Sequence, residues 1–97
     1  YTDLPLHKQR PVVVISAPAF HKANHHLIGL MITTGKDSTW QGDVRLQDIK
    51  AAGLKTPSFV RLKIFTLPLD LIIKPLGKLS KPDLKSVRAV LKDVISI

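Results

Sequence analysis

The chain has 97 residues, which suffice for one domain around a single hydrophobic core and are too few for two. Hydrophobic residues make up 44% of it and charged residues 23%, a composition that excludes an intrinsically disordered chain. No apolar run approaches the roughly 18 residues of a membrane-spanning helix. The absence of cysteine excludes disulfides and thiolate chemistry, and suits the reducing cytoplasm, where we expect the protein to reside.

The charge is strongly positive and unevenly distributed. Fifteen lysines and arginines oppose seven acidic residues, all of them aspartate, so the net charge is +8. Residues 51–97 contribute nine basic and three acidic side chains, which is +6 of that total. Such a domain attracts polyanions, and nucleic acid, an acidic protein or a membrane surface all become candidate partners. The scarcity of carboxylates disfavours a Ca²⁺ or Mg²⁺ site and a two-carboxylate hydrolase.

The first half of the chain alternates between apolar runs and turn-forming stretches. The β-branched and apolar residues predict strands at residues 11–15, 27–33 and 43–46. Residues 16–26 and 34–42 are expected to connect them, the former with one helical turn. Gly29 within the second strand allows a bulge or a close backbone approach. Residues 47–52 can form a short helix that ends at Gly53 in a left-handed conformation.

The clearest strand of the second half lies at residues 59–65. Its period of two predicts one face with Phe59, Arg61, Lys63 and Phe65, and another with Val60, Leu62 and Ile64. We expect the second face to lie in the core, and the first to carry two cations between two aromatic rings. Residues 69–74, bounded by two prolines, are a further short strand candidate.

The C-terminal segment carries the one clear helix signal. Ser80 followed by Pro82 and Asp83 resembles a helix start with its N-cap. The apolar stripe then recurs at helical spacing, at Leu84, Val87, Leu91 and Val94. About five short strands and one helix predict a mainly β protein, a small barrel or curled sheet against which the helix lays its stripe.

Five short motifs occur in an order that is specific to one family. They lie at residues 8–16 (KQRPVVVIS), 31–35 (MITTG), 53–61 (GLKTPSFVR), 65–67 (FTL) and 76–80 (LGKLS). In this order and spacing the sequence resembles the PemK/MazF-type toxins of type II toxin–antitoxin systems over nearly its whole length. The resemblance implies an SH3-like barrel of the CcdB/PemK/MazF type with a C-terminal helix, a homodimer, and an mRNA interferase. Such an enzyme cleaves single-stranded RNA without a metal or cofactor and is neutralised by a cognate antitoxin.

The sequence departs from the family at its start. Family members usually open with a strand before the Tyr-Thr-Asp of residues 1–3. We therefore expect the single domain at residues 1–97 to lack that strand, which would leave a neighbouring strand with an exposed edge.

The resemblance also assigns candidate catalytic residues. Arg61 matches the arginine of the family's V-R segment and Arg10 that of its R-P pair, while Thr33 and Thr34 match its hydroxyl pair. Arginine suits a phosphate site because its planar fork matches phosphate oxygens and stays protonated. Without the resemblance, each would be an ordinary surface cation or strand threonine.

The proton acceptor is not assigned by these motifs. In several relatives an aspartate two residues after the arginine acts as general base, but this sequence has Lys63 at that position. The remaining candidates are Lys63 itself and His7, whose imidazole could transfer a proton near neutral pH. His21, His25 and His26 lie close in sequence, but without a neighbouring acid or cysteine we expect no metal site there.

The RNA-binding candidates are cations and one aromatic ring. Trp40, the only tryptophan, can stack on an unpaired base or instead cover one end of the barrel. Lys8 and Lys63 are further cations expected to contact RNA. The helix residues Lys81, Lys85, Arg88 and Lys92 form a cationic face, which is either a solvated surface or an attractor for RNA or an acidic antitoxin.

Three other functions compete with cleavage. Lys63 in place of the acid favours a module on the same fold that binds RNA or protein without cutting. A CcdB-like, gyrase-targeting toxin would act through its C-terminal helix and would not need Arg10, Thr33 and Arg61. A basic structural protein is disfavoured by the arginines and threonines at strand ends.

Overall fold

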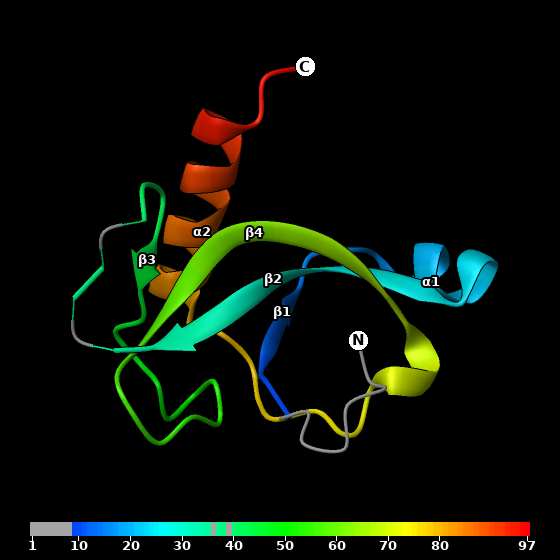
Figure 1. Cartoon of the computed structure of the whole chain (residues 1–97), viewed down its shortest axis with the longest axis horizontal. Coiled ribbons are helices and arrows are strands. Elements are labelled where there is room, and N and C mark those ends of the chain that lie inside the picture. Colours follow the sequence, from blue (N-terminus) through cyan, green and yellow to red (C-terminus); the bar gives the residue numbers. More distant parts are fainter. Residues whose placement is uncertain (1–8, 36, 39) are drawn as a thin grey trace.

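A computed structural model describes residues 9–35, 37–38 and 40–97. The chain forms one curled antiparallel sheet with strand order β1-β2-β4-β3, a half-barrel completed by a C-terminal helix (Figure 1). The strands are β1 (Val12–Val14), β2 (His26–Thr34), β3 (Val44–Arg45) and β4 (Ser58–Pro68). The helices are α1 (Pro18–Asn24), the single 3₁₀ turn η1 (Leu69–Leu71) and α2 (Lys81–Val94). The mainly β fold with a C-terminal helix is therefore confirmed.

The curl of the sheet has a local cause in the pairing of β2 with β4. Leu30 pairs with Ile64, but the next residue, Met31, pairs with Arg61, so Leu62 and Lys63 are extra residues on β4. Such a bulge bends its strand and increases the local twist. Figure 1 shows the result as two long strands that arch together.

The burial of side chains along β4 departs from a strict alternation. Val60 is fully buried, as the period of two predicts. The prediction for the two faces is wrong at Phe59, which lies before the bulge and is buried, and at Ile64, which lies after it and is 47% exposed. The two extra residues interrupt the pairing of β4 between Arg61 and Ile64, but they do not account for the burial of Phe59, which is regularly paired with Thr33.

The core lies between one face of the sheet and α2. It consists of apolar side chains from all four strands, the segment after β3 and the helix: Val13, Leu30, Ile32, Val44, Leu46, Val60 and Val87. The predicted stripe of the helix is confirmed at Val87, which is buried, and at Leu91, which packs against this cluster. Val94, at the end of the stripe, is exposed instead, because the helix extends beyond the sheet there.

The start of α2 is fixed by two polar side chains. Ser80 is the N-cap, and its hydroxyl accepts the backbone N–H of Asp83 at 3.3 Å. The buried Asp83 carboxylate accepts the backbone N–H groups of Gln47 and Asp48 at 2.9 and 3.0 Å. The helix is thereby tied to the segment that follows β3.

Two predicted elements are wrong and two glycine predictions are correct. Residues 47–52 form turns rather than a helix, and side-chain carboxylates accept the N–H groups of Gln47, Asp48 and Ala51. Residues 69–74 begin with η1 rather than a strand. Gly53 adopts the expected positive φ of 77°, and a Cβ at Gly29 would overlap the Val12 side chain. In the described part of the chain, no helix is long and apolar enough to cross a membrane.

Candidate active site

The centre of the candidate site is an ion pair between β4 and the turn that leads into β3. Arg61 donates from Nε to Oδ1 of Asp43 at 3.1 Å and from Nη2 to Oδ2 at 2.9 Å. Gly42, with a φ of 94°, makes the turn that delivers Asp43 to this position. The Ser38 hydroxyl donates a further hydrogen bond to Asp43. The carboxylate is nearly buried, with 4% of the side chain exposed, while the Arg61 side chain is 23% exposed.

The charges of this pair are fixed by their mutual hydrogen bonds. Burial raises the pKa of Asp43, but hydrogen bonds from Arg61 and Ser38, together with the guanidinium charge, lower it below its ordinary value. The hydrogen bond to Asp43 raises the pKa of Arg61, against a smaller opposing effect of desolvation. Asp43 is therefore ionised at neutral pH, and it is too weak a base to be a good proton acceptor.

The side-on geometry leaves part of the guanidinium available. Asp43 occupies Nε and one N–H of Nη2. Both N–H groups of Nη1 and the second N–H of Nη2 are not used in this pair. Arg61 can therefore keep its orientation on Asp43 and still donate to the oxygens of a phosphate.

Trp40 and Lys63 complete the cluster around Arg61. The Trp40 ring lies 5.3 Å from Cζ of Arg61 and 5.1 Å from Nζ of Lys63, measured to the ring centroid. Both distances are those of cation–π contacts. The tryptophan is 42% exposed, so the ring contacts both cations and keeps free surface. Lys63 thus lies in the same cluster as Arg61. The resemblance to the family would place an aspartate at this position, and this chain has a lysine there.

The sheet separates the two threonines. Thr33 pairs with Phe59 and Thr34 pairs with Ser58 across β2 and β4. Because successive residues of a strand point to opposite faces, Thr33 lies on the face of Phe59 and Arg61, and Thr34 on the other. The structure therefore brings only Thr33 to the face that carries Arg61.

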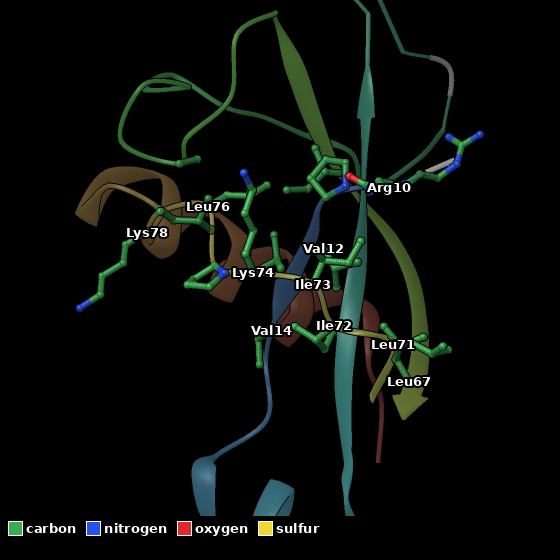
Figure 2. A pocket seen from close by; sticks show the side chains of 18 of the residues that line it. Arg10, Val12, Val14, Leu67, Leu71, Ile72, Ile73, Lys74, Leu76 and Lys78 are labelled. Carbon is green, nitrogen blue, oxygen red and sulfur yellow. The ribbon is translucent and has the colours of Figure 1, made fainter. Parts of the chain in front are cut away.

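Arg10 lies two residues before β1, the strand that flanks β2 on its other side. The N–H of Ile32 donates to the carbonyl of Pro11 at 3.3 Å, which continues the β1–β2 register one residue beyond β1. This register sets Arg10 across from Thr33. Arg10 is exposed, and Figure 2 shows its side chain extending away from the labelled apolar residues. Arg10, just before β1, thus lies across from Thr33 on β2, and β2 is next to β4, the strand of Arg61.

Two charged residues of this face are missed by the sequence analysis. Asp43 is the ion-pair partner of Arg61, and Arg45 places its guanidinium 5.4 Å from the ring centroid of Phe59. Asp43 directly precedes β3 and Arg45 lies in it, and β3 is the strand next to β4. The sequence motifs point to an acid on the strand of Arg61, whereas Asp43 comes from the turn directly before the neighbouring strand β3. The alternation of residues 43–46 is the only signal that could have pointed to them.

His21 and His26 make local hydrogen-bond contacts. His21 Nε2 lies 2.6 Å from the Ser16 hydroxyl, and His26 Nδ1 lies 2.8 Å from the carbonyl of Asn24. Among residues 9–35, 37–38 and 40–97, no three potential histidine or aspartate ligands converge. His7 and Lys8, the remaining candidates for proton transfer and RNA binding, lie outside the described residues.

The half-barrel with its C-terminal helix is the fold of MazF toxins. A Mycobacterium tuberculosis toxin, MazF-mt6, superposes with a TM-score of 0.73 at 20% identity, covering 89% of this chain and 85% of that one. A MazE-MazF structure from Deinococcus radiodurans gives a TM-score of 0.72 at 17% identity, covering 91% and 82%. Identities this low show the fold alone.

The family itself is shown by the sequence. The model of the PemK-like, MazF-like toxins of type II toxin-antitoxin systems matches residues 5–95, and the chain belongs to this family. A search of curated proteins found no match.

Proposed function

We propose that the chain is a toxin endoribonuclease that cleaves single-stranded RNA without a metal. The observation that carries this proposal is the side-on Arg61–Asp43 pair, which fixes a guanidinium with unused N–H groups on the sheet face shared with Thr33. Family membership supports the same function, because the family consists of toxins of toxin-antitoxin systems.

The proposed reaction uses a nucleophile that RNA already carries. The 2′-oxygen loses its proton and attacks the adjacent phosphorus, the bond to the 5′-oxygen breaks, and the leaving oxygen takes up a proton. The products are a 2′,3′-cyclic phosphate and a 5′-hydroxyl. Arg61 would stabilise the charge that develops on the phosphoryl oxygens, and Arg10 and Thr33 would hold the strand in line.

Two residues are candidates for accepting the proton of the 2′-oxygen, Lys63 and His7. Asp43 is unsuited to the role because its pKa is lowered. Lys63 contacts Trp40 within the Arg61 cluster and is a candidate only in its neutral form. His7, the second candidate for proton transfer, lies outside the described residues and remains a prediction from the sequence.

The proposed partners follow from the charge and from the family. With a net charge of +8, the chain suits both RNA and an acidic antitoxin segment. The Deinococcus radiodurans MazF was solved together with MazE, and we propose a corresponding antitoxin for this chain. We also propose a homodimer, which light scattering on the purified protein would detect.

Cleavage is tested directly with the purified protein. A mixed-sequence single-stranded RNA is incubated with excess chelator, and the fragment ends are analysed for cyclic phosphate by mass spectrometry. Wild-type protein should cut, Arg61→Ala should not, and Lys22→Ala, which removes an exposed cation of α1, should cut like the wild type. Intact RNA with the wild-type protein, or equal cutting by Arg61→Ala, would count against the proposal.

A second candidate function is RNA binding without cleavage. It is favoured by Lys63, which supplies a cation where several relatives supply an acid, and by Asp43, which neutralises part of the charge of Arg61. In that case the wild-type protein retains RNA on a filter but releases no fragments. Arg61→Ala would then weaken retention only in part.

A further inference from the structure

Arg45 lies on the same face of the sheet as Arg61, one strand further from Thr33. It pairs with Phe59 across β3 and β4, and Phe59 in turn pairs with Thr33 across β4 and β2. Directly paired residues share a face, and so do Phe59 and Arg61, which lie two residues apart on β4. Arg45 and Arg61 are therefore diagonal neighbours, a relationship that places Cα atoms about 7–8 Å apart and lets long side chains meet.

An aromatic ring restricts each of the two guanidinium groups. Cζ of Arg45 lies 5.4 Å from the centroid of the Phe59 ring. The corresponding distance from Arg61 to Trp40 is 5.3 Å. Phe59 is buried, with 7% of its surface exposed, whereas Arg45 is exposed. The guanidinium of Arg45 thus covers a buried ring while the residue stays accessible to a ligand, and the contact limits its motion.

The charges on this face favour an anion longer than a single phosphate. Arg45, Arg61 and Lys63 bring three positive charges to one face, and the carboxylate of Asp43 offsets one of them through its pair with Arg61. Cations this close repel one another, and a bound polyanion would relieve the repulsion. Consecutive phosphates of an extended nucleic acid strand have a spacing similar to that of diagonal neighbours in a sheet. Two arginines in this arrangement can therefore contact one phosphate each.

Resting on the proposed function, in which Arg61 contacts the scissile phosphate, we propose that Arg45 binds the adjacent phosphate of the RNA strand. The strand would cross the sheet from Thr33, over Arg61, to Arg45. A guanidinium has five N–H donors in a planar fork, so Arg45 can donate to phosphate oxygens as well as to a partner within the protein. Because the contact is to the RNA backbone, it raises affinity without selecting a base sequence. Arg45 is thus a substrate-binding residue and takes no part in the bond rearrangement.

The salt dependence of RNA binding tests the phosphate contact. The probe is a labelled single-stranded RNA of mixed sequence with fluorine in place of its 2′-hydroxyls, which prevents cleavage, and fluorescence anisotropy measures binding at a series of salt concentrations. Arg45→Gln removes the charge and keeps a side chain long enough to cover Phe59. It should weaken binding about tenfold at low salt. It should also reduce the slope of log affinity against log salt by about 0.7, the value for one phosphate contact on a single strand.

A matched variant controls for the change in net charge. Lys22→Gln also removes one positive charge, from the exposed surface of α1, and should change neither the affinity nor the slope. Circular dichroism and the Tm confirm that each variant is folded. If Arg45 served only to cover Phe59, Arg45→Gln would lower the Tm and leave the salt slope of RNA binding unchanged, an outcome that would overturn the proposal.

Single uncharged phosphates locate the contact along the RNA. Cleavage by the wild-type protein identifies the scissile phosphate, and each phosphate around it is then replaced in turn by a methylphosphonate in the uncleavable RNA. Wild type and Arg45→Gln should bind equally only when the missing charge lies at one position directly adjacent to the scissile phosphate. Replacing any other phosphate should preserve the roughly tenfold difference between the two proteins. A difference that persists at both adjacent positions would overturn the proposal.

Failure of this proposal and failure of the proposed cleavage give different results. Cutting by the wild type, with equal affinity and equal slope for Arg45→Gln, would overturn the role of Arg45 and leave cleavage intact. Binding without cutting by the wild type would contradict cleavage, while the change in slope would still support the contact at Arg45. No binding of RNA by the wild type would overturn both.

Discussion

Arg61 and Asp43 lie 18 residues apart in sequence and meet side-on, through Nε and Nη2, at 3.1 and 2.9 Å. The pair links β4 to the turn before β3, and Ser38 supports it from the same turn. A surface ion pair between two mobile side chains contributes little to stability. Here the acid is almost fully buried, and the pair's main consequence is the fixed orientation of a partly exposed guanidinium.

This geometry predicts that arginine at position 61 cannot be replaced by lysine. Arg61→Lys keeps the positive charge but cannot bridge both carboxylate oxygens and still present donors outward. We expect the rate of RNA cleavage to fall about 100- to 1,000-fold, close to the loss in Arg61→Ala. Single-turnover cleavage measures the rate, and Arg88→Lys on the exposed face of α2 is the matched control. Full activity of Arg61→Lys would show that charge alone suffices.

A second prediction concerns the pH dependence of stability. Because the pKa of Asp43 is lowered from 3.8 in the folded state, its stabilising contribution is complete above that value. The contribution is lost as the pH falls below 3.8 and through the lower folded-state pKa. Asp43→Asn should therefore be less stable than the wild type at neutral pH, and this difference should shrink in acid.

Urea unfolding at a series of pH values measures that difference. Asp93→Asn, an exposed substitution on α2, serves as the control and should change the unfolding free energy little at any pH. A gap between wild type and Asp43→Asn that stays constant down to acid pH would contradict an ionised, paired Asp43.

Local sequence patterns predict the strand of Arg61 and several features of the surrounding fold. The strand of Arg61, the helix start at Ser80 and the close approach at Gly29 follow from spacing, capping and the absence of a side chain. Asp43 could not be found in this way, because its partnership with Arg61 depends on which strand lies beside β4. The bulge at Leu62 and Lys63 was equally hidden, since no proline or glycine marks it.

A third prediction concerns RNA binding at Trp40, which can also be followed by the fluorescence of that residue. As the only tryptophan it reports the site by fluorescence, and its contacts with Arg61 and Lys63 place it where RNA is proposed to bind. We expect RNA to change its emission, and Trp40→Ala to weaken binding about tenfold by loss of stacking, while Trp40→Phe retains most affinity. Phe20→Ala on α1, another partly exposed aromatic, is the control. Equal effects at both positions would argue against a specific role.

The last prediction concerns Asp83, whose substitution should lower the stability of the fold without changing the candidate active site. Asp83 is buried and accepts two backbone N–H groups from the segment after β3, so Asp83→Ala removes two charge-assisted hydrogen bonds. We expect a loss of about 2–3 kcal/mol in the free energy of unfolding, measured in urea. Ser86→Ala, on the exposed side of α2, should cost less than about 0.5 kcal/mol. Because Asp83 contacts neither Arg61 nor Asp43, RNA cleavage per folded molecule should be unchanged. A specific activity that falls with Asp83→Ala while the protein stays folded would mean that the turn carrying Asp43 depends on the anchor of α2.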